Sequence, residues 1–438
     1  MLKTEDPKIY NLIKAEEMRL KNTLQMIASE NYPSKAVLEA LGSVLNFKYS
    51  EGYPYKRYYQ GNVNADEVEV TAEERAQKLF KVPYVNVQPY SGSPANAAVQ
   101  LAILKPLKSK IMGLSLAFGG HLTHGAEVSF SGKIFKSVFY KLNEKGLLDY
   151  KEIEKMALKE KPDLIICGAT AYPRIIDFKK FGEIADKVGC YLMADISHIT
   201  GLIIAGVHPN PVPYVHIITT TTHKTLRGPR GALIMVTQKG LKKDADLPSK
   251  IDKAVFPGLQ GGPHDNQTAA IAVALLEASK PGFKKYGEQI VRNSKTLAGE
   301  LKKYGFNLIS GGTDNHLMLI DLSNKQVNGA IAAHALEIAG IILNKNAVPN
   351  DQNPPFYPSG LRLGTAATTT RGMKEKEMLK IALWINEVVN ECPKIVLPKT
   401  KEERAEVWNK FKKELAGNKK LLLIAKEVKQ MTSKFPLP

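Results

Sequence analysis

A lysine that follows four consecutive threonines is the residue with the clearest chemical potential. The segment 219–225 reads TTTTHKT and lies between an apolar, β-branched stretch and the turn-forming sequence GPRG. Lys224 is therefore predicted at the end of a buried strand, where loss of solvation favours the neutral amine. A neutral amine is what Schiff-base chemistry requires. A surface lysine that simply follows a strand is the alternative interpretation.

A second group of residues suits an anionic ligand. Ser91, Gly92 and Ser93 lie between a predicted strand and a predicted helix. We expect Ser93 at the N-cap of this helix and Pro94 at its first position. Free amides at a helix N-terminus bind phosphate, although an ordinary helix cap explains the same residues. The sequence contains no GxGxxG or Walker pattern, so a nucleotide is not indicated.

Polar residues also follow other predicted strands. Asp195 ends a strand and could pair with a protonated pyridine nitrogen, while His121 lies in glycine-rich backbone and could stack on an aromatic ring. The pairs His121–His124 and Asp195–His198 have a spacing that metal ligands can use. No cysteine or acidic cluster completes a coordination shell, so we expect no metal.

Two further segments place charged residues in unusual settings. Arg362 lies in the apolar segment SGLRLG, where an unpaired guanidinium is costly to bury. A substrate carboxylate bound bidentately or an internal salt bridge would both compensate it. Glu51 lies in a loop at 46–64 that is rich in tyrosine and glycine, which indicates a pocket lining or a subunit contact.

These residues need a scaffold, and the hydrophobic pattern predicts one in which strands and helices alternate. Strands are expected at 84–88, 110–114, 136–140, 163–168, 190–195, 215–219 and 232–236, and helices at 6–28, 65–81, 93–105, 150–160, 177–188 and 264–280. The alternation predicts an α/β fold with a mostly parallel sheet covered on both faces. A smaller α+β domain should follow, with helices at 283–304 and 327–339, strands at 316–322 and 361–364, a loop at 344–360 and C-terminal helices.

Composition limits the class of protein. The chain has 438 residues, 44% of them hydrophobic, and no run of eighteen apolar residues, so we expect two domains and no membrane span. The N-terminus has no apolar signal core, and Cys167, Cys190 and Cys392 are far apart, which favours a cytoplasmic protein with buried thiols. The net charge of +18 comes without a nucleic-acid-binding motif, so we expect a lysine-rich solvated surface that attracts small anions.

Segments along most of the chain resemble serine hydroxymethyltransferases and occur in that family's order. They are IASENY, KYSEGYPYKRYYQG, QPYSGS, GGHLTHG, ADISHITGL, TTTTHKT, GPRG, FPGLQGGP, SGGTDNHL, NKNAVPND and SGLRLGT. The resemblance implies the aspartate-aminotransferase-like fold (fold-type I), pyridoxal phosphate as cofactor, and a homodimer that shares its active sites. It also implies an N-terminal arm and contact loop at 1–64, a large cofactor domain at 65–281 and a small α+β domain at 282–438.

The resemblance assigns roles to individual residues. Lys224 would form the Schiff base, Asp195 would pair with the pyridinium nitrogen, and His121 would stack on the ring. The other expected cofactor contacts are Ser91, Gly92, Ser93, Thr170, His198 and Thr221, with Tyr49 and Gly262 from the neighbouring subunit. The further expected catalytic residues are Glu51, Tyr59 and His223. The expected substrate contacts are Ser29, Glu51, Tyr59, Leu116, Leu122, Asn346 and Arg362.

The implied reaction is the reversible transfer of the hydroxymethyl carbon of serine to tetrahydrofolate, which gives glycine and 5,10-methylenetetrahydrofolate. Four residues depart from the family pattern: Tyr90, Pro94, Phe118 and Thr170 stand where histidine, glutamine, a polar residue and serine are usual. Another fold-type I enzyme, such as a threonine aldolase or an aminotransferase, is the alternative. The loop sequence EGYPYKRYYQG favours the hydroxymethyltransferase.

Overall fold

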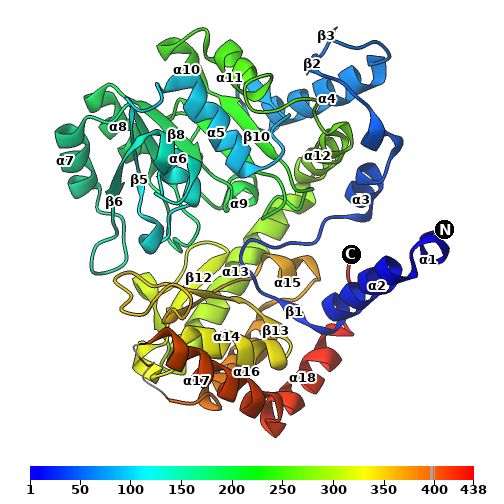
Figure 1. Ribbon diagram of the computed structural model, residues 1–438, viewed down its shortest axis with the longest axis vertical. Coiled ribbons are helices and arrows are strands. Elements are labelled where there is room, and N and C mark those ends of the chain that lie inside the picture. The colour runs from blue at the N-terminus through cyan, green and yellow to red at the C-terminus, as the bar shows by residue number, and fades with distance from the viewer. Residues whose placement is uncertain (395–397, 399) are drawn as a thin grey trace. The chain divides into compact units, whose positions relative to one another are not determined.

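The computed structural model describes residues 1–394, 398 and 400–438, and it divides the chain into two compact units. One unit is Pro33–Glu288, and the other combines Met1–Tyr32 with Gln289–Pro438. Figure 1 labels most of their helices and several of their strands. The predicted arm at 1–64, cofactor domain at 65–281 and small domain at 282–438 are defined by cofactor binding and subunit contact. This division therefore stays a prediction.

The unit Pro33–Glu288, all of which the structure describes, is built around a seven-stranded sheet of order β4-β10-β9-β8-β7-β5-β6. Its strands are β4 (Tyr84–Asn86), β5 (Lys110–Leu114), β6 (Lys136–Tyr140), β7 (Leu164–Gly168), β8 (Tyr191–Asp195), β9 (Ile217–Thr221) and β10 (Ala232–Val236). The five strands from β9 to β6 pair in parallel, whereas β10 is antiparallel to both of its neighbours. The predicted α/β fold with a mostly parallel sheet is confirmed.

Helices cover both faces of this sheet. Every residue of β7, β9 and β10 is buried, and successive side chains of a strand point to opposite faces. Ala95 and Ala98 of α5 pack into one core with Leu247 and Ile251 of α11. The helices of this unit are α3 (Lys35–Leu41), α4 (Val63–Phe80), α5 (Gly92–Ile103), α6 (Phe130–Ile134), α7 (Tyr150–Glu160), α8 (Phe178–Val188), α9 (Thr200–Ile204), α10 (Gln238–Lys243), α11 (Leu247–Val255) and α12 (Asp265–Ala278).

The other unit is of α+β type. In its described residues, a four-stranded antiparallel sheet has the order β11 (Asn307–Leu308), β12 (Leu317–Asp321), β15 (Gly360–Gly364), β14 (Asn344–Asn346). Its helices are α1 (Leu2–Glu5), α2 (Pro7–Asn22), α14 (Gly329–Ile338), α15 (Ala366–Thr370), α16 (Glu375–Asn390), α17 (Lys401–Ala416) and α18 (Lys419–Thr432). The division between the units falls inside α13 (Pro281–Lys303).

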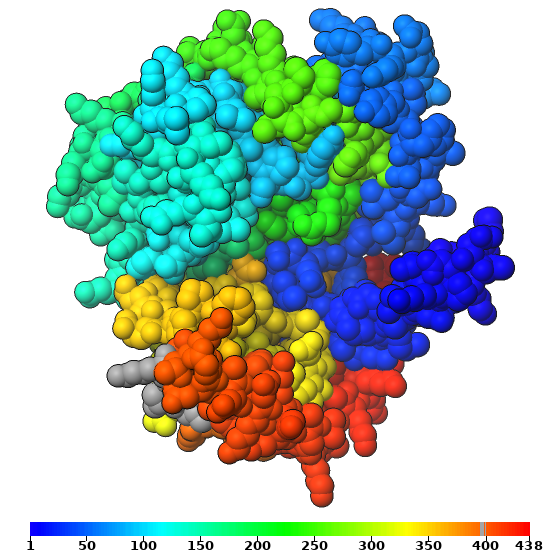
Figure 2. Space-filling view, viewed as in Figure 1, coloured from blue at the N-terminus to red at the C-terminus, as the bar shows by residue number. Residues whose placement is uncertain are grey.

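The predicted N-terminal helix at 6–28 is wrong beyond the end of α2. Thr23 adopts extended backbone, and its hydroxyl hydrogen-bonds a carbonyl oxygen of the last helical turn. The chain continues as β1 (Leu24–Gln25), which pairs in parallel with β13 (Ile341–Ile342). Leu24 and Ile27 therefore do not extend the apolar stripe. No residue of α2 is buried, and its side chains are visible in deep blue in Figure 2.

Two other element predictions also need correction. The strand predicted at 215–219 lies two residues too early, because the β-branched threonines continue β9 to Thr221, where it pairs with β10. The loop predicted at 344–360 begins with β14, whose polar residues have low strand propensity but pair with β15. All three cysteines are buried and free, as predicted. Among the described residues, no helix has both the length and the apolar character needed to cross a bilayer.

Candidate active site

A pocket at the carboxyl ends of β7, β8 and β9 contains the residues with the most distinctive chemistry. This edge of a parallel sheet is where ligands of α/β proteins bind. The residues that line the pocket are Gly92, Asn96, His121, His124, Ala169, Thr170, Asp195, Ser197, His198, Thr221 and Lys224. Seven of the sequence-predicted cofactor contacts are therefore in one place.

Lys224 lies three residues beyond β9, in backbone that is held on both sides. The Thr222 amide donates to the Gly231 carbonyl at 3.1 Å, and the Thr222 hydroxyl donates to the Pro229 carbonyl at 2.7 Å. On the other side, the Thr225 hydroxyl donates to the His198 carbonyl at 3.1 Å. Both threonines are fully buried, so the lysine side chain starts from a fixed position.

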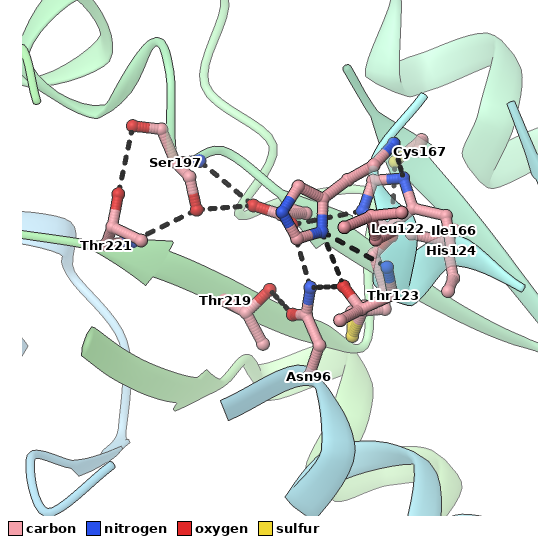
Figure 3. A network of polar contacts seen from close by, with 12 residues as sticks. Asn96, Leu122, Thr123, His124, Ile166, Cys167, Ser197, Thr219 and Thr221 are labelled. Atoms are coloured by element: carbon pink, nitrogen blue, oxygen red, sulfur yellow. Dashed lines mark hydrogen bonds and ion pairs between the residues drawn. The ribbon is translucent and has the colours of Figure 1, made fainter. Parts of the chain in front are cut away.

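Asp195 is the centre of a polar network, and Figure 3 labels its partners Asn96, His124 and Ser197. Its Oδ2 accepts from Asn96 Nδ2 at 2.9 Å and contacts His124 Nε2 at 3.0 Å. Its Oδ1 accepts from the Ser197 amide and hydroxyl at 3.1 and 2.6 Å. Burial opposes ionisation of this carboxyl, but the hydrogen bond from His124 and nearby positive charge, including that of Lys224, place its pKa well below the ordinary value. The pocket therefore contains a buried carboxylate.

Asn96 joins this carboxylate to the sheet. Its Oδ1 accepts from the Thr219 hydroxyl at 2.6 Å, and its Nδ2 also donates to the Thr123 hydroxyl at 2.9 Å. Asn96 is 1% exposed, and these bonds fix the orientation of its amide. The network therefore connects α5, β9 and the end of β8 through side chains alone (Figure 3).

His121 contributes an uncharged ring to the pocket. Its Nδ1 lies 2.8 Å from the Thr123 hydroxyl and accepts from the Thr123 amide at 3.2 Å. Burial lowers the pKa of His121 to about 4, against the opposing effect of the Asp195 charge. His121, His124 and Asp195 offer ligand atoms within 4.8 Å of one another, but Asp195 already interacts with four protein donors.

The N-terminus of α5 opens into the same pocket, with a cap that differs from the prediction. Ser91, not Ser93, is the N-cap, because Ser91 is extended and its carbonyl accepts the first helical bond from the Ala95 amide. Pro94 therefore lies inside the first turn, where its missing N–H costs nothing. A Cβ added at Gly92 would lie 2.7 Å from Cγ2 of Thr221, so the backbone at this point approaches β9 closely.

A second group of predicted site residues gathers outside this pocket. Tyr49 and Tyr59 are 57% and 45% exposed and pack edge to face at 5.3 Å. The Tyr59 hydroxyl donates to Glu51 Oε2 at 3.4 Å, and a Cβ added at Gly262 would lie 3.6 Å from the Tyr49 ring. Tyr90, one of the departures from the family pattern, donates to the Gly262 carbonyl at 2.7 Å. We call the four residues Tyr49, Glu51, Tyr59 and Gly262 the tyrosine cluster.

The remaining predicted residues of the unit Pro33–Glu288 are not among the pocket-lining residues. Leu116 and Leu122 lie in short 3-10 turns and are 47% and 45% exposed. His223 is half-buried, and its Nδ1 has no hydrogen-bond partner among the described residues. Burial and the positive charge of Lys224 lower the pKa of His223 to about 3.

Three predicted substrate residues belong to the other unit. Arg362 on β15 is 8% exposed, and its Nε donates to Asn344 Oδ1 at 3.0 Å. Burial lowers the pKa of Arg362 to about 10. Asn346 on β14 donates to the Ala347 carbonyl at 2.7 Å, and Ser29 is half-buried.

Sequence reasoning missed the three residues whose side chains bond to Asp195, namely Asn96, His124 and Ser197. Asn96 lies four residues after Gly92, so a helical spacing could have placed both on one face. The spacing of His124, three residues after His121, suggests only a metal ligand and does not indicate a bond to Asp195. Ser197 follows Asp195 by two residues, a spacing typical of a side chain that closes a turn on its own backbone.

The pocket fits pyridoxal phosphate by the chemistry of its groups. It combines a primary amine, a buried carboxylate suited to a protonated pyridine nitrogen, and an uncharged imidazole. The N-terminus of α5 adds free amides suited to a phosphate. On a mostly parallel α/β sheet, these features define a fold-type I pyridoxal-phosphate enzyme.

Comparisons with known proteins identify the family within this class. The family model described as serine hydroxymethyltransferase matches residues 2–385. The chain is 54% identical over 437 residues to the serine hydroxymethyltransferase of Desulfotalea psychrophila, which covers 100% of this chain and 96% of the relative. The corresponding protein of Acidothermus cellulolyticus is 52% identical over 100% of this chain and 97% of its own. The serine hydroxymethyltransferase of a Nitratiruptor species is 52% identical over 94% of this chain and 97% of its own length.

The chain therefore belongs to the serine hydroxymethyltransferase family. The family depends on pyridoxal phosphate and uses tetrahydrofolate as co-substrate. The activity of the chain is the reversible transfer of the serine hydroxymethyl carbon to tetrahydrofolate. The predicted family, fold type, reaction and cofactors are thus confirmed.

Proposed function

We propose that this chain catalyses the transfer as a homodimer, with Lys224 as the residue that bears the cofactor and Glu51 as the acid–base residue. One observation carries the proposal. Lys224 lines the same pocket as the ionised Asp195, the uncharged His121 and the N-terminus of α5. This is the set of groups that a pyridoxal-phosphate site needs.

When bound, pyridoxal phosphate supplies an aldehyde that condenses with amines and a protonated ring that accepts electrons. Asp195 would hold the proton at the ring nitrogen, because its hydrogen bonds keep it ionised. His121 is uncharged at neutral pH, so it would lie against the ring without opposing the ring's positive charge. The proposed cofactor contacts also include Ser91, Gly92, Ser93, Thr170, His198 and Thr221.

The proposed substrate residues bind different groups of serine. Arg362 and Ser29 would bind the amino-acid carboxylate, for which a buried guanidinium is well suited. Glu51 and Tyr59 would move protons at the hydroxymethyl group, and their contact at 3.4 Å supports a joint role. The further proposed substrate and catalytic residues are Leu116, Leu122, Asn346 and His223.

An exposed apolar surface supports the homodimer. Val44, Phe47, Tyr58 and Val63 are between 71% and 80% exposed and lie close in sequence to Tyr49, Glu51 and Tyr59 of the tyrosine cluster. This segment is the medium-blue part of the surface in Figure 2. Aromatic residues exposed together are typical of protein interfaces. Tyr49 and Gly262 would then reach the cofactor of the partner subunit. We also propose a cytoplasmic location, which the three free, buried cysteines support.

The purified chain loaded with pyridoxal phosphate tests the activity directly. With serine and tetrahydrofolate it should form glycine and 5,10-methylenetetrahydrofolate, and omission of tetrahydrofolate should remove most serine cleavage. Serine cleavage at an unchanged rate without tetrahydrofolate would contradict the proposal and favour an aldolase. Because Glu51 belongs to the same cluster as Tyr49, we expect it to serve the partner's site as well. Mixing Glu51→Gln chains with Lys224→Arg chains should then restore some activity, since one site of such a hybrid dimer has both Lys224 and Glu51. No recovery in verified hybrids would contradict the shared site.

A further inference from the structure

We propose that Arg57 is the positioning residue for Glu51, an inference that rests on the proposed role of Glu51 in the transfer. Glu51 lies between Ser50 and Gly52 in the chain. Arg57 Nη1 donates to the carbonyl oxygens of both of these neighbours, at 2.9 Å each. One guanidinium nitrogen therefore holds the backbone on either side of the catalytic carboxyl group.

The other nitrogens of the same guanidinium are anchored to a helix. Arg57 Nε donates to Asp66 Oδ1 at 2.8 Å, and Nη2 donates to Glu69 Oε2 at 2.6 Å. Asp66 and Glu69 lie one turn apart on α4, and the Arg57 side chain is 3% exposed. Because α4 is a long helix packed on α12, it gives the guanidinium a rigid support.

Further bonds tie the same short segment to the body of the unit. Gln88 Nε2 donates to the Gly52 carbonyl at 2.9 Å and to Glu69 Oε1 at 2.7 Å. The Ser50 hydroxyl donates to Asp265 Oδ1 at 2.8 Å. The backbone at Glu51 is therefore fixed from α4, from the end of β4 and from α12.

The side chain of Glu51, in contrast, has few restraints of its own. Its Oε2 accepts the long bond of 3.4 Å from the Tyr59 hydroxyl. A Cβ added at Gly261 would lie 3.2 Å from its Oε1, so the absence of a side chain there leaves space beside the carboxylate. The position of the carboxylate is thus set mainly through the backbone that Arg57 holds.

Lysine cannot replace this geometry, although it can replace the charge. Arginine presents five donors in a rigid plane, whereas lysine presents one flexible ammonium. In Arg57→Lys, the ammonium would still neutralise Asp66 and Glu69, but it cannot also reach the carbonyls of Ser50 and Gly52 in the same arrangement. A displacement of a catalytic group by about 1 Å can reduce the rate by about 10²-fold.

The test compares Arg57→Lys, Glu51→Gln and the double variant, all as cofactor-loaded dimers. The measurements are kcat and KM for folate-dependent serine cleavage, and cofactor affinity from its visible absorbance. We expect Arg57→Lys to lower kcat by about 10- to 100-fold with cofactor affinity unchanged. In the Glu51→Gln background, Arg57→Lys should cause no further loss.

A matched control is Arg371→Lys, since Arg371 is also buried and also donates to backbone carbonyls, but far along the chain in the other unit. Its kcat should be that of the wild type.

Gln88→Met is a second probe, which removes the bonds of this side chain to the Gly52 carbonyl and to Glu69 without removing a buried charge. It should lower kcat several-fold, and this loss should also vanish in the Glu51→Gln background. Losses that multiply in the double variants would overturn the proposal, because Arg57 would then act through another group. Full folate-dependent turnover by Glu51→Gln would instead refute the role of Glu51. The two failures are therefore distinguishable.

Discussion

Gly92→Ala tests whether the close approach of α5 to β9 shapes the cofactor pocket. Alanine suits the helical backbone at this position, so strain comes only from the added methyl group. Its Cβ would lie 2.7 Å from Cγ2 of Thr221, where ordinary contact begins at 3.4 Å. Overpacking of this kind costs about 1–3 kcal/mol. Relief requires α5 to move away from β9, which displaces the amides of Gly92 and Ser93.

We therefore expect Gly92→Ala to lower the free energy of unfolding by about 1–3 kcal/mol and to weaken cofactor binding by about tenfold or more. Thr221→Ser removes the methyl group that causes the overlap and keeps the hydroxyl. The double variant should recover most of both losses. Urea unfolding and titration with pyridoxal phosphate measure the two quantities. A double variant no better than Gly92→Ala would refute the reasoning, as would a Gly92→Ala protein with wild-type affinity.

Three other substitutions probe separate parts of the chain. Arg362→Ala should weaken serine binding by about 10²-fold or more, because each charged hydrogen bond contributes roughly 1.5–3 kcal/mol. The cofactor content of this variant should stay normal. An unchanged serine affinity would show that Arg362 serves an internal salt bridge instead. Arg371→Met should lower the free energy of unfolding by about 2–4 kcal/mol in urea, because Arg371 donates to carbonyls at the ends of α2 and α18; a smaller change than 1 kcal/mol would contradict this. Burial and the charges of Glu69 and Asp252 raise the pKa of Glu73 to about 8. Between about pH 4.5 and 8 the folded chain therefore keeps a proton on Glu73 that the unfolded chain loses. The free energy of unfolding should fall as the pH rises through this range. Glu73→Gln should therefore gain stability relative to the wild type across this range, and parallel pH profiles in urea unfolding would contradict the assignment.

Local patterns predicted most of the fold. The strands at 110–114, 136–140 and 232–236 match β5, β6 and β10 in full. Apolar runs mark the largely buried β5 and the buried β10, whereas β6 is an edge strand in which only Tyr140 is buried. The helix at 150–160 matches α7, which has Asp149 as a side-chain cap.

Errors arose where a distant segment decides the local structure. Leu24 continues the apolar spacing of α2, but β13 pairs with it from more than three hundred residues away. Asn344–Asn346 has no strand propensity, yet β15 makes it an edge strand. The spacing of residues within a segment does not predict which distant strand the segment will pair with.

The same limit applies to the candidate site. Lys224, Asp195 and the α5 N-terminus were recognisable because strand ends and helix starts have local signatures. Asn96 and His124 were not, because their role depends on hydrogen bonds to Asp195 across 99 and 71 residues. Nor does the sequence alone indicate that Arg57 holds the carbonyls beside Glu51.

The central claim is that Lys224 bears the cofactor, and borohydride reduction followed by peptide mapping tests it most directly. Reduction of the loaded enzyme should leave the pyridoxyl group on the peptide that contains Lys224. Lys224→Arg should fold and retain its unfolding midpoint, but should carry no label after reduction. A reduced pyridoxyl group mapped to any other lysine of the wild-type chain would contradict the account.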